Sequence, residues 1–391
     1  MMGIFSQIFA SLVAAIIRAI AATYYQLKYY LVERPQRRPP VIHQGLPTQS
    51  TGLWAICAIY QRKRVSPNLL AFLATLRDAG YNVIAVHNGP LGESLITELK
   101  SVCQTIMVRS PGGRDFGSHK FGTEYLAGLK DLTINQVIYC NDSVFVRPSG
   151  LKDLLEKIRQ MPDEFIALTE SFEPRYHVQS WFIAFNGKTF SAPFFLEFWQ
   201  NYKPLSYRRH LIIGGEVKLT RWLLRHDIYP NVLYSGDATI RQIFAGDEKQ
   251  IVPELIMFSN NQIYSDISNI LTSRSKTNDA MLWISPNPPV PGSPNNNHTV
   301  KMLERLLADH AIANEMNLFN LLLMKFMNFP FLKKDLVFKG GYHFVQIERV
   351  VEECHGADAQ YMTEIRGAFR SRDTIRYRNW FYKSLAAAGV I

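Results

Sequence analysis

The sequence of 391 residues contains little cysteine and little charge. Its four cysteines are Cys57, Cys103, Cys140 and Cys354. Because they lie far apart and form no C-x-x-C pair, neither a disulfide framework nor a zinc site is expected. We expect buried free thiols in a reducing compartment. With 47% hydrophobic and only 19% charged residues, the composition excludes a disordered chain and a collagen-like fibre, and the length suffices for one large domain or two ordinary ones.

Acidic residues are outnumbered by basic ones. The 33 Asp and Glu residues face 43 Lys and Arg residues, which gives a formal net charge of +10. Much of the positive charge lies near the two ends, in the proline-rich segment 34–40 and in residues 366–383. Since these residues do not form one patch interleaved with aromatic side chains, we do not expect nucleic-acid binding. An anionic membrane surface is the partner that this distribution favours.

A long apolar run is also missing, although the first segment is mostly apolar. Between residues 4 and 32 the only charged residues are Arg18 and Lys28. A spanning helix needs roughly 20 apolar residues, and Arg18 near the bilayer midplane would cost at least about 2.5 kcal/mol. Apolar residues recur instead at the spacing of a helix. They are Phe5, Ile8, Phe9, Leu12, Ile16, Ile20, Tyr24, Leu27 and Leu31.

This pattern predicts a helix that lies in the membrane interface. Four tyrosines between residues 24 and 30 precede the basic segment 34–40. The tyrosines would then lie at headgroup level and the arginines against anionic lipid. The segment lacks the positive amino-terminal region and the A-x-A site that mark a cleaved signal peptide. The alternative is an apolar helix that docks on the protein's own core or on a partner chain.

Alternating strand-like and helix-like segments follow, which predicts βαβ units around a parallel, Rossmann-type sheet. Strands are expected at 53–60, 81–87, 105–109, 136–140, 165–168 and 181–185. Helices are expected at 67–79, 93–103, 118–129, 193–202 and 215–226. In such a sheet the ligand site lies outside the carboxyl ends of the strands.

Composition divides the chain into four parts. They are a membrane-associated helix with its basic proline-rich linker (1–40), an α/β domain (41–284), a linker rich in proline and asparagine (285–299) and a helical region with a basic tail (300–391). The linker is expected because prolines and asparagines crowd into it. The fold class is therefore α/β, with a terminal helix before the domain and a helical extension after it.

The first candidate motif is the glycine-rich segment 112–117, between a predicted strand and a predicted helix. It is neither a G-x-G-x-x-G fingerprint nor a P-loop, because it lacks the GK[ST] ending. Its glycines, Gly113 among them, allow close backbone approach to a ligand, and a helix start favours anions. Arg114 could hold a phosphate, and Asp115 a ribose or sugar hydroxyl. The alternative is a structural turn with an internal Arg–Asp pair.

The second motif is Asn141-Asp142-Ser143, directly after an apolar strand. A carboxylate at a strand end, flanked by small polar residues, suits a hard divalent cation that also binds phosphate oxygens. The alternative is a turn in which Asp142 caps a backbone N–H. The turn after the second strand, beginning at Asn88, lies at the same predicted edge of the sheet.

A third cluster, at 169–182, gathers carboxylates, aromatics, a histidine and a glutamine between two short strands. Gln179 and His177 could bond sugar hydroxyls, and Glu170 or His177 could take a proton from an attacking hydroxyl. Glu216, which follows two glycines at the start of a predicted helix, could reach the same hydroxyl or merely complement the helix dipole. A surface loop with one satisfied histidine is the alternative for the cluster.

Taken together, these segments resemble the rhamnan synthesis protein F family of bacterial polysaccharide glycosyltransferases. The similar segments are HNGPL (87–91), GGRDFG (112–117), YCNDSVF (139–145), LTESFEPRYHVQSWFIAF (168–185), FW (198–199), GGEVKLTRWLL (214–224) and FPFLKKDL (329–336). Their order and spacing carry the resemblance, which covers roughly 53–336. It includes neither the first apolar helix nor about the last 50 residues.

The resemblance implies a GT-A-like fold and transfer of a deoxysugar, typically L-rhamnose from a dTDP donor, with inversion. The acceptor would be a lipid-linked glycan, such as an O-antigen or lipopolysaccharide precursor, at the cytoplasmic face of the bacterial inner membrane. Other glycan-assembly enzymes could be partners there.

The same resemblance implies roles for the candidate residues. Asp142, through Mg²⁺ or Mn²⁺, would hold the diphosphate, and Glu170 ranks first as base, before His177 and Glu216. The GT-A class places D-x-D where this chain has Asn141-Asp142-Ser143, so Arg114 or His119 could supply positive charge instead of a metal. Two alternatives stay open: a UDP- or GDP-sugar donor, and a non-catalytic, degenerate transferase that acts as a membrane assembly subunit.

Overall fold

The computed structural model describes residues 2–35, 38–246, 248–274, 296–311, 318–339, 341–356 and 359–371. The strands are β1 (Val41–Gln44), β2 (Leu53–Ile59), β3 (Asn82–Asn88), β4 (Thr105–Arg109), β5 (Gln136–Asn141), β6 (Val144–Val146), β7 (Phe165–Ala167), β8 (Glu170–Ser171), β9 (His177–Val178), β10 (Phe182–Asn186), β11 (Asn231–Val232) and β12 (Phe331–Lys333).

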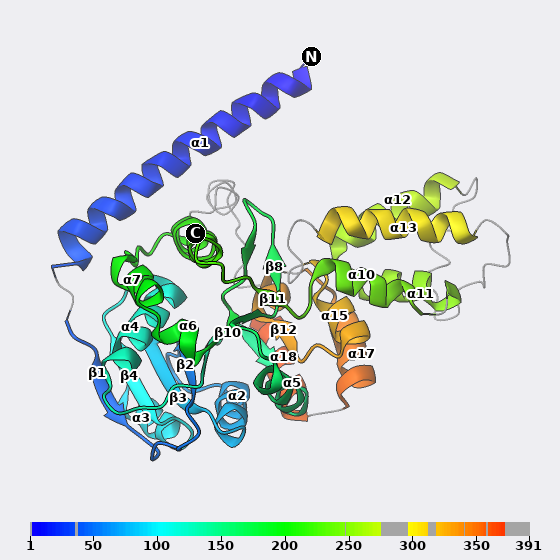
Figure 1. Ribbon diagram of the computed structural model, residues 1–391. Coiled ribbons are helices and arrows are strands. Elements are labelled where there is room, and N and C mark those ends of the chain that lie inside the picture. Colours follow the sequence, from blue (N-terminus) through cyan, green and yellow to red (C-terminus); the bar gives the residue numbers. More distant parts are fainter. Residues whose placement is uncertain are drawn as a thin grey trace.

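The helices begin with a long amino-terminal one and end with a group that follows the sheet (Figure 1). Up to the last sheet strand they are α1 (Met2–Lys28), η1 (Tyr29–Glu33), α2 (Pro67–Asp78), α3 (Glu93–Lys100), α4 (Arg114–Gly128), α5 (Pro148–Gln160), α6 (Gly187–Ser191), α7 (Pro193–Asn201), α8 (Arg208–His210), η2 (Leu211–Val217) and α9 (Lys218–Leu224). After it come α10 (Gly236–Phe244), α11 (Glu248–Phe258), α12 (Asn261–Arg274), α13 (Asn296–Ala311), α15 (Asn320–Met327), α16 (Lys334–Lys339), α17 (Phe344–His355) and α18 (Ala359–Ser371).

The main sheet has eight strands in the order β1-β4-β3-β2-β5-β10-β7-β11. Strands β2 to β5 are parallel, as predicted. The expectation of a wholly parallel sheet is wrong, because β10 runs antiparallel to both of its neighbours and β1 runs antiparallel to β4. The strand β10 can reverse because it is reached through a short irregular segment and the β8–β9 hairpin, which need no crossover helix.

Each face of the sheet carries its own core. Along β2, Trp54 and Ile56 belong to one cluster and Ala55 and Cys57 to the other, since successive side chains of a strand point to opposite faces. The first face is covered by α4, α6, α7 and α9. The second is covered by α2, α3 and α5, and its core continues into the helices from α10 to α18. The C-terminal helices thus share a hydrophobic core with the sheet.

Most predicted elements of the α/β part are confirmed within a few residues. The main difference is α4, which begins at Arg114 rather than near residue 118. All four cysteines are free, and three of them are buried. Part of the predicted linker, 285–295, lies outside the described residues, as does the basic tail after residue 371; α13 already begins at Asn296.

The amino-terminal part of the helix α1 extends away from the rest of the molecule (Figure 1). Its apolar stripe is solvent-exposed, each large side chain to at least 51%. The stripe consists of Leu12, Ile16, Ile20, Tyr24 and Leu27, continued by Leu31. The other side of α1 contacts the protein, where Tyr25 stacks on Tyr207. Among the described helices, none combines the length and apolarity needed to cross a membrane.

Candidate functional site

The sheet order reverses between β2 and β5, and the candidate site lies at the carboxyl ends of these two strands. The order β4-β3-β2-β5 corresponds to the 3-2-1-4 arrangement of doubly wound sheets, whose ligands bind beside this reversal. Asp142 follows β5 directly. Its Oδ2 accepts hydrogen bonds from Tyr60 N (2.9 Å) and Gln61 Nε2 (2.6 Å). The carboxylate therefore ties the loop after β2 to the end of β5.

Asn141 joins this strand end to the start of α4. Its Nδ2 donates to Asp115 Oδ2 at 2.8 Å, and its Oδ1 accepts from the backbone N–H and the hydroxyl of Ser143. Residues from two of the predicted motifs, 112–117 and 141–143, are thus brought together. Burial raises the pKa of Asp115 to about 6, with the Asp142 charge adding to the effect and Arg114, Asn141 and Arg109 opposing it. Asp115 can therefore gain or lose a proton near neutral pH.

The glycine-rich turn is held from below by Arg109, the last residue of β4. Its buried guanidinium donates to the carbonyl oxygens of Gly112 (2.5 Å) and Arg114 (2.7 Å). Gly113 has φ +70° and would collide with Pro204 if it carried a Cβ, so this turn requires glycine. Asn88 Oδ1 accepts from Gly112 N at 3.2 Å, which places the predicted residue in the same turn. These hydrogen bonds fix the turn, which explains why α4 begins at Arg114 and not near residue 118.

The sequence analysis missed the cations at this edge of the sheet, which come from two distant parts of the chain. The loop after β2 carries Arg62, Lys63 and Arg64, all exposed; a run of three cations after the first parallel strand was the available signal. Lys334 arrives from the far end of the chain, because β12 pairs with β6, and its Nζ donates to the Asp142 carbonyl at 2.7 Å. No local pattern could have placed Lys334 beside Asp142, since 192 residues separate them.

His119 cannot supply positive charge at neutral pH, so that expectation is wrong. The imidazole is fully buried in α4, stacked on Tyr139, with Nε2 bonded to the carbonyl of Cys140 at 3.2 Å. Burial lowers the pKa of His119 to about 4, although the hydrogen bond to Cys140 acts in the opposite direction. The ring is therefore neutral in the folded protein above about pH 5.

This pKa predicts an acid-sensitive contribution to stability. The unfolded chain binds a proton at His119 near pH 6.5 and the folded chain only near pH 4, so protons favour unfolding between these values. Relative to His119→Phe, the free energy of unfolding of the unaltered protein should fall by up to about 1.4 kcal/mol per pH unit from pH 6.5 to 4. Urea unfolding across this range measures it. A constant difference would contradict the assignment; the Asp115 contribution is common to both proteins and cancels.

The β8–β9 hairpin separates two residues that the sequence analysis grouped as candidate bases. Glu170 pairs with Val178, and Ser171 pairs with His177. Since opposed residues share a face and successive residues alternate, Glu170 and His177 point to opposite faces of the hairpin. Burial raises the pKa of Glu170, against the effect of its hydrogen bond to Tyr176. Glu170 therefore stands apart from the other two candidates.

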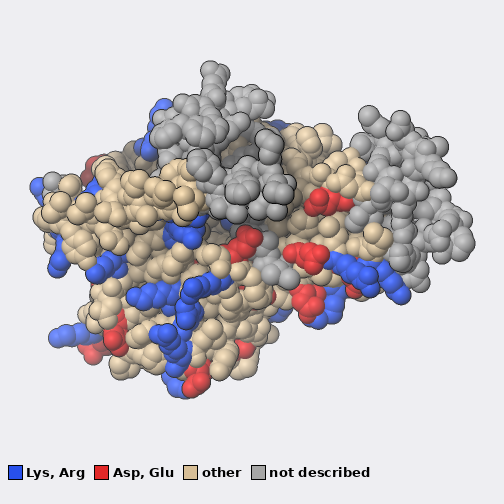
Figure 2. Space-filling model, turned by 90° about the horizontal axis from the view of Figure 1, so that it is seen from above, with Lys and Arg blue, Asp and Glu red and all other residues tan. Residues whose placement is uncertain are grey.

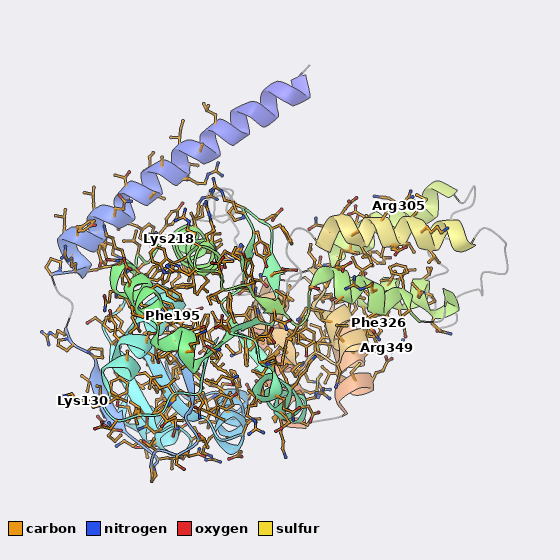
Figure 3. All side chains as sticks on the ribbon, in the orientation of Figure 1. Lys130, Phe195, Lys218, Arg305, Phe326 and Arg349 are labelled. Carbon is orange, nitrogen blue, oxygen red and sulfur yellow. The ribbon has the colours of Figure 1, made fainter. Side chains whose placement is uncertain are left out.

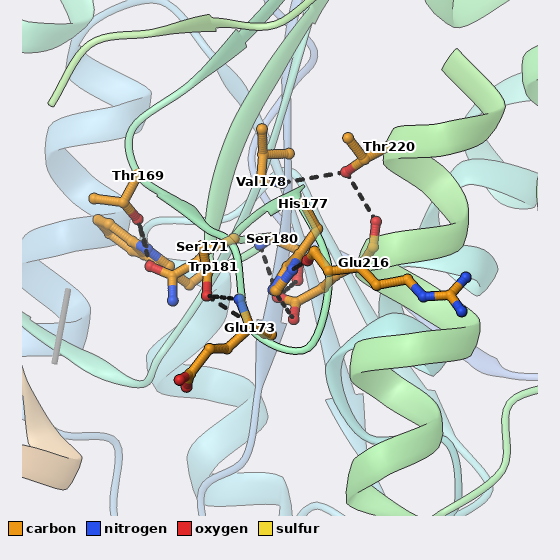
Figure 4. A network of polar contacts seen from close by, with 11 residues as sticks. Thr169, Ser171, Glu173, His177, Val178, Ser180, Trp181, Glu216 and Thr220 are labelled. Carbon is orange, nitrogen blue, oxygen red and sulfur yellow. Dashed lines mark hydrogen bonds and ion pairs between the residues drawn. The ribbon is translucent and has the colours of Figure 1, made fainter. Parts of the chain in front are cut away.

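Glu216 and His177, in contrast, come together (Figure 4). Glu216 Oε1 accepts from the backbone N–H of Ser180 (2.9 Å) and from its hydroxyl (2.8 Å), and Oε2 lies 3.6 Å from His177 Nε2. His177 Nδ1 bonds the carbonyl of Arg175 at 2.8 Å, so Nδ1 carries the proton. The Nε2 atom of His177 therefore faces the Glu216 carboxylate.

The structure links this pair to the strand end of Asn141 by two routes. The backbone N–H of Asn141 donates to Trp181, which follows Ser180 in the chain. Gly215, beside Glu216, packs so closely on Phe116, beside Asp115, that a Cβ would lie about 3.0 Å from the ring. The chain segments that carry Glu216 and Asp115 therefore lie next to each other. Gln179, in contrast, is buried, and its Oε1 accepts from the Thr169 hydroxyl at 2.7 Å.

The candidate site offers few protein ligands to a divalent cation. Among the described residues, no group of three His, Cys, Asp or Glu side chains is arranged to hold a metal ion. Magnesium often takes only one or two protein carboxylates and completes its shell with water and substrate phosphates. A cation at Asp142 would therefore take its remaining ligands from a bound phosphate compound or from water.

Comparison with known families and proteins gives three findings. The family model described as "Rhamnan synthesis protein F" matches residues 83–276, which include the end of β5, the glycine-rich turn and the β8–β9 hairpin. The uncharacterized protein y4gN of Sinorhizobium fredii is 28% identical over 171 residues, which cover 43% of this chain and 44% of that protein. Virulence protein VirA of Vibrio anguillarum is 34% identical over 114 residues, covering 28% and 35%. The chain thus matches less than half the length of either relative.

Similarity to solved structures was found as well. The 4-diphosphocytidyl-2C-methyl-D-erythritol synthase from Anaerococcus prevotii shares 11% sequence identity, with a TM-score of 0.30, over 48% of this chain and 90% of that one. A TM-score of this size does not establish a shared fold. The α/β assignment therefore rests on the observed sheet order.

Proposed function

Since the chain belongs to the rhamnan synthesis protein F family, we propose that it is a glycosyltransferase of polysaccharide biosynthesis. It transfers a deoxysugar, L-rhamnose from a dTDP donor, to a lipid-linked glycan such as an O-antigen precursor. The observation that carries this proposal is the arrangement of Asp142, Asn141 and Asp115 at the sheet reversal, with Glu216 on the adjoining part of the site. A GT-A-like fold agrees with the parallel order of β2 to β5.

The donor would bind at the carboxyl ends of β2 and β5. The turn at Gly113 itself packs on Pro204, so the donor would lie beside it, near the start of α4, where the helix dipole favours an anion. Asp115, held by Asn141, would accept a hydrogen bond from a ribose or sugar hydroxyl. The cations of the loop after β2 and Lys334 would balance the diphosphate charge. A divalent cation at Asp142 would add charge neutralisation of the leaving group.

Transfer would follow a single displacement. The acceptor hydroxyl oxygen attacks the anomeric carbon, the bond from that carbon to the diphosphate oxygen breaks, and the configuration inverts. Glu216 takes the hydroxyl proton, and the nucleoside diphosphate leaves with the bonding electrons. Ser180 and His177 contact the Glu216 carboxylate and would hold it in position for this proton transfer. We place Glu216 before Glu170 as base, because the segment that carries Glu216 packs on the start of α4 through Gly215 and Phe116.

The donor assignment is tested with a panel of nucleotides. Thermal unfolding is followed with dTDP, UDP and GDP at equal concentrations. The dTDP complex should be the most stable, because a ligand that binds the folded state stabilises it by an amount that rises with affinity. If dTDP gives no more stabilisation than UDP or GDP, the rhamnose donor loses its support and a UDP- or GDP-sugar takes its place.

We further propose that the chain acts at an anionic membrane surface, the cytoplasmic face of the inner membrane. The exposed apolar stripe of α1 supports this, since an apolar helix face beside tyrosines and cations suits the bilayer interface. Deletion of residues 1–32 should move the protein from the membrane fraction to the supernatant. Partitioning that stays unchanged after the deletion would contradict the proposal.

A further inference from the structure

A second concave site lies next to Glu216 and is strongly basic. It is a pocket of about 450 Å³ between the β8–β9 turn and the helices α8, η2 and α9. Five cations line it: Arg175, Arg209, Lys218, Arg221 and Arg225. Within the part of the chain that the structure describes, no acidic side chain lines this pocket and none of the five forms an ion pair. An anionic ligand is what such a pocket would bind.

The sequence of α9 explains why the cations converge. Lys218, Arg221 and Arg225 follow one another at intervals of three and four residues, so they project from one face of the helix. Trp222 lies among them, half-buried, and its indole N–H donates to the carbonyl of Phe194 at 2.8 Å. The pocket thus combines a cationic rim with an apolar wall formed by Trp222 and Ile213.

The chain segments that line the pocket also carry the proposed base and its neighbouring histidine. Lys218 follows Glu216 by two residues, and Arg175 precedes His177 by two. The carbonyl oxygen of Arg175 accepts a hydrogen bond from His177 Nδ1, and Nε2 of the same ring lies 3.6 Å from Glu216 Oε2. If the anionic group of a ligand binds in this pocket, the part of the ligand attached to that group would lie close to Glu216. That position suits the acceptor, because the donor part of the site lies on the other side, around Asp115 and Asn141.

The opposite side of the pocket leads toward α1. A second hollow of about 340 Å³ shares Arg209 and Ile213 with the basic pocket and is bounded by α1 through Arg18 and Gln26. The exposed apolar stripe of α1 lies beyond it. Seen from above, Lys and Arg side chains gather over the α/β part on this face (Figure 2), and Lys218 lies on the side that faces α1 (Figure 3).

We propose that the basic pocket binds the diphosphate of the lipid-linked acceptor, an assignment that rests on the proposed function. Arginine forks match phosphate oxygens in bidentate hydrogen bonds, and several cations are needed to balance a diphosphate. Trp222 and Ile213 would contact the first carbons of the lipid, whose remainder runs along α1 to the bilayer. The glycan end of the acceptor then lies at Glu216, with its attacking hydroxyl toward the donor.

The test uses farnesyl diphosphate, a soluble lipid diphosphate, titrated into the full-length chain by calorimetry with and without dTDP. The double variant Lys218→Gln/Arg221→Gln removes two cations of the pocket. The variant Lys130→Gln/Lys157→Gln removes two exposed cations elsewhere; Lys130 lies far from the pocket (Figure 3). All four replaced side chains are exposed, so folding should be preserved. Inorganic pyrophosphate and farnesol are titrated as separate ligands.

The pocket variant should bind farnesyl diphosphate at least about tenfold more weakly than the unaltered chain, a loss of about 1.4 kcal/mol, while the control variant binds it equally well. Equal affinity in all three proteins would overturn the proposal, as would the absence of any binding. If pyrophosphate binds as tightly as farnesyl diphosphate, the lipid contributes nothing to affinity. If dTDP displaces farnesyl diphosphate, the pocket belongs to the donor. Either result also overturns the proposal. Failure of dTDP to bind, with the pocket result intact, would contradict only the proposed donor.

Discussion

Replacing Glu216 by Gln is expected to lower the rate of sugar transfer by about a thousandfold, or about 4 kcal/mol of activation free energy. A glutamine can keep the hydrogen bonds from the N–H and hydroxyl of Ser180, so the fold and donor binding should stay close to those of the unaltered chain. What it loses is the capacity to take a proton. The decrease should therefore appear in kcat, with little change in KM for the donor, in a steady-state transfer assay.

The matched control is Glu170→Gln, which removes a carboxylate from the opposite face of the β8–β9 hairpin. Its effect on kcat should stay within about tenfold, because Glu170 lacks contacts to the donor part of the site among the described residues. The reverse outcome, a large loss for Glu170→Gln and a small one for Glu216→Gln, would restore Glu170 as the base and contradict the mechanism proposed above.

Replacing Asp142 by Ala should lower transfer by at least about a hundredfold through loss of donor binding. Asp142 Oδ2 holds both Tyr60 N and Gln61 Nε2, so the alanine variant releases the loop that carries Arg62, Lys63 and Arg64. The main-chain carbonyl that accepts from Lys334 is unchanged. We expect the fold to be retained, because Asp142 lies at the edge of the sheet and is only partly buried. Calorimetry with dTDP measures the effect.

Asp142→Asn separates two roles of this side chain. An amide oxygen can still accept hydrogen bonds from Tyr60 N and Gln61 Nε2, so the variant can keep the loop anchor while it loses the charge. If anchoring is the main role, donor affinity should recover substantially. If charge neutralisation through a bound cation dominates, the asparagine variant should be as weak as the alanine variant. Full activity in Asp142→Ala would remove this residue from the mechanism.

The sequence predicts the α/β part of the fold well, for a physical reason. Apolar strands such as 53–59 and 136–141 are buried on both faces, and amphipathic segments such as 67–78 separate them, so local periodicity marks each element. Periodicity does not reveal the antiparallel direction of β10, because this strand is as apolar and as buried as the parallel strands. The sheet direction there depends on how the chain returns through the β8–β9 hairpin.

The candidate site was predictable in part. Asp142, Asn141 and Asp115 follow strand ends or a helix start in the sequence, and these positions converge by topology alone. The sequence grouped Glu170 with His177, yet they lie on opposite faces of a hairpin, because a difference of one residue in register reverses the direction of a side chain. Lys334 reaches Asp142 only through the pairing of β12 with β6, a contact that no local pattern encodes.

The central claim is that a nucleotide-sugar binds at the carboxyl ends of β2 and β5, and a crystal structure with dTDP tests it most directly. The account predicts that the diphosphate lies between the loop of residues 60–65 and the glycine-rich turn, near Asp142, with Asp115 in hydrogen-bond distance of the ribose or of the position of the sugar. A nucleotide bound elsewhere, in the basic pocket of α9 for example, or a chain that takes up no dTDP at saturating concentration, would contradict it.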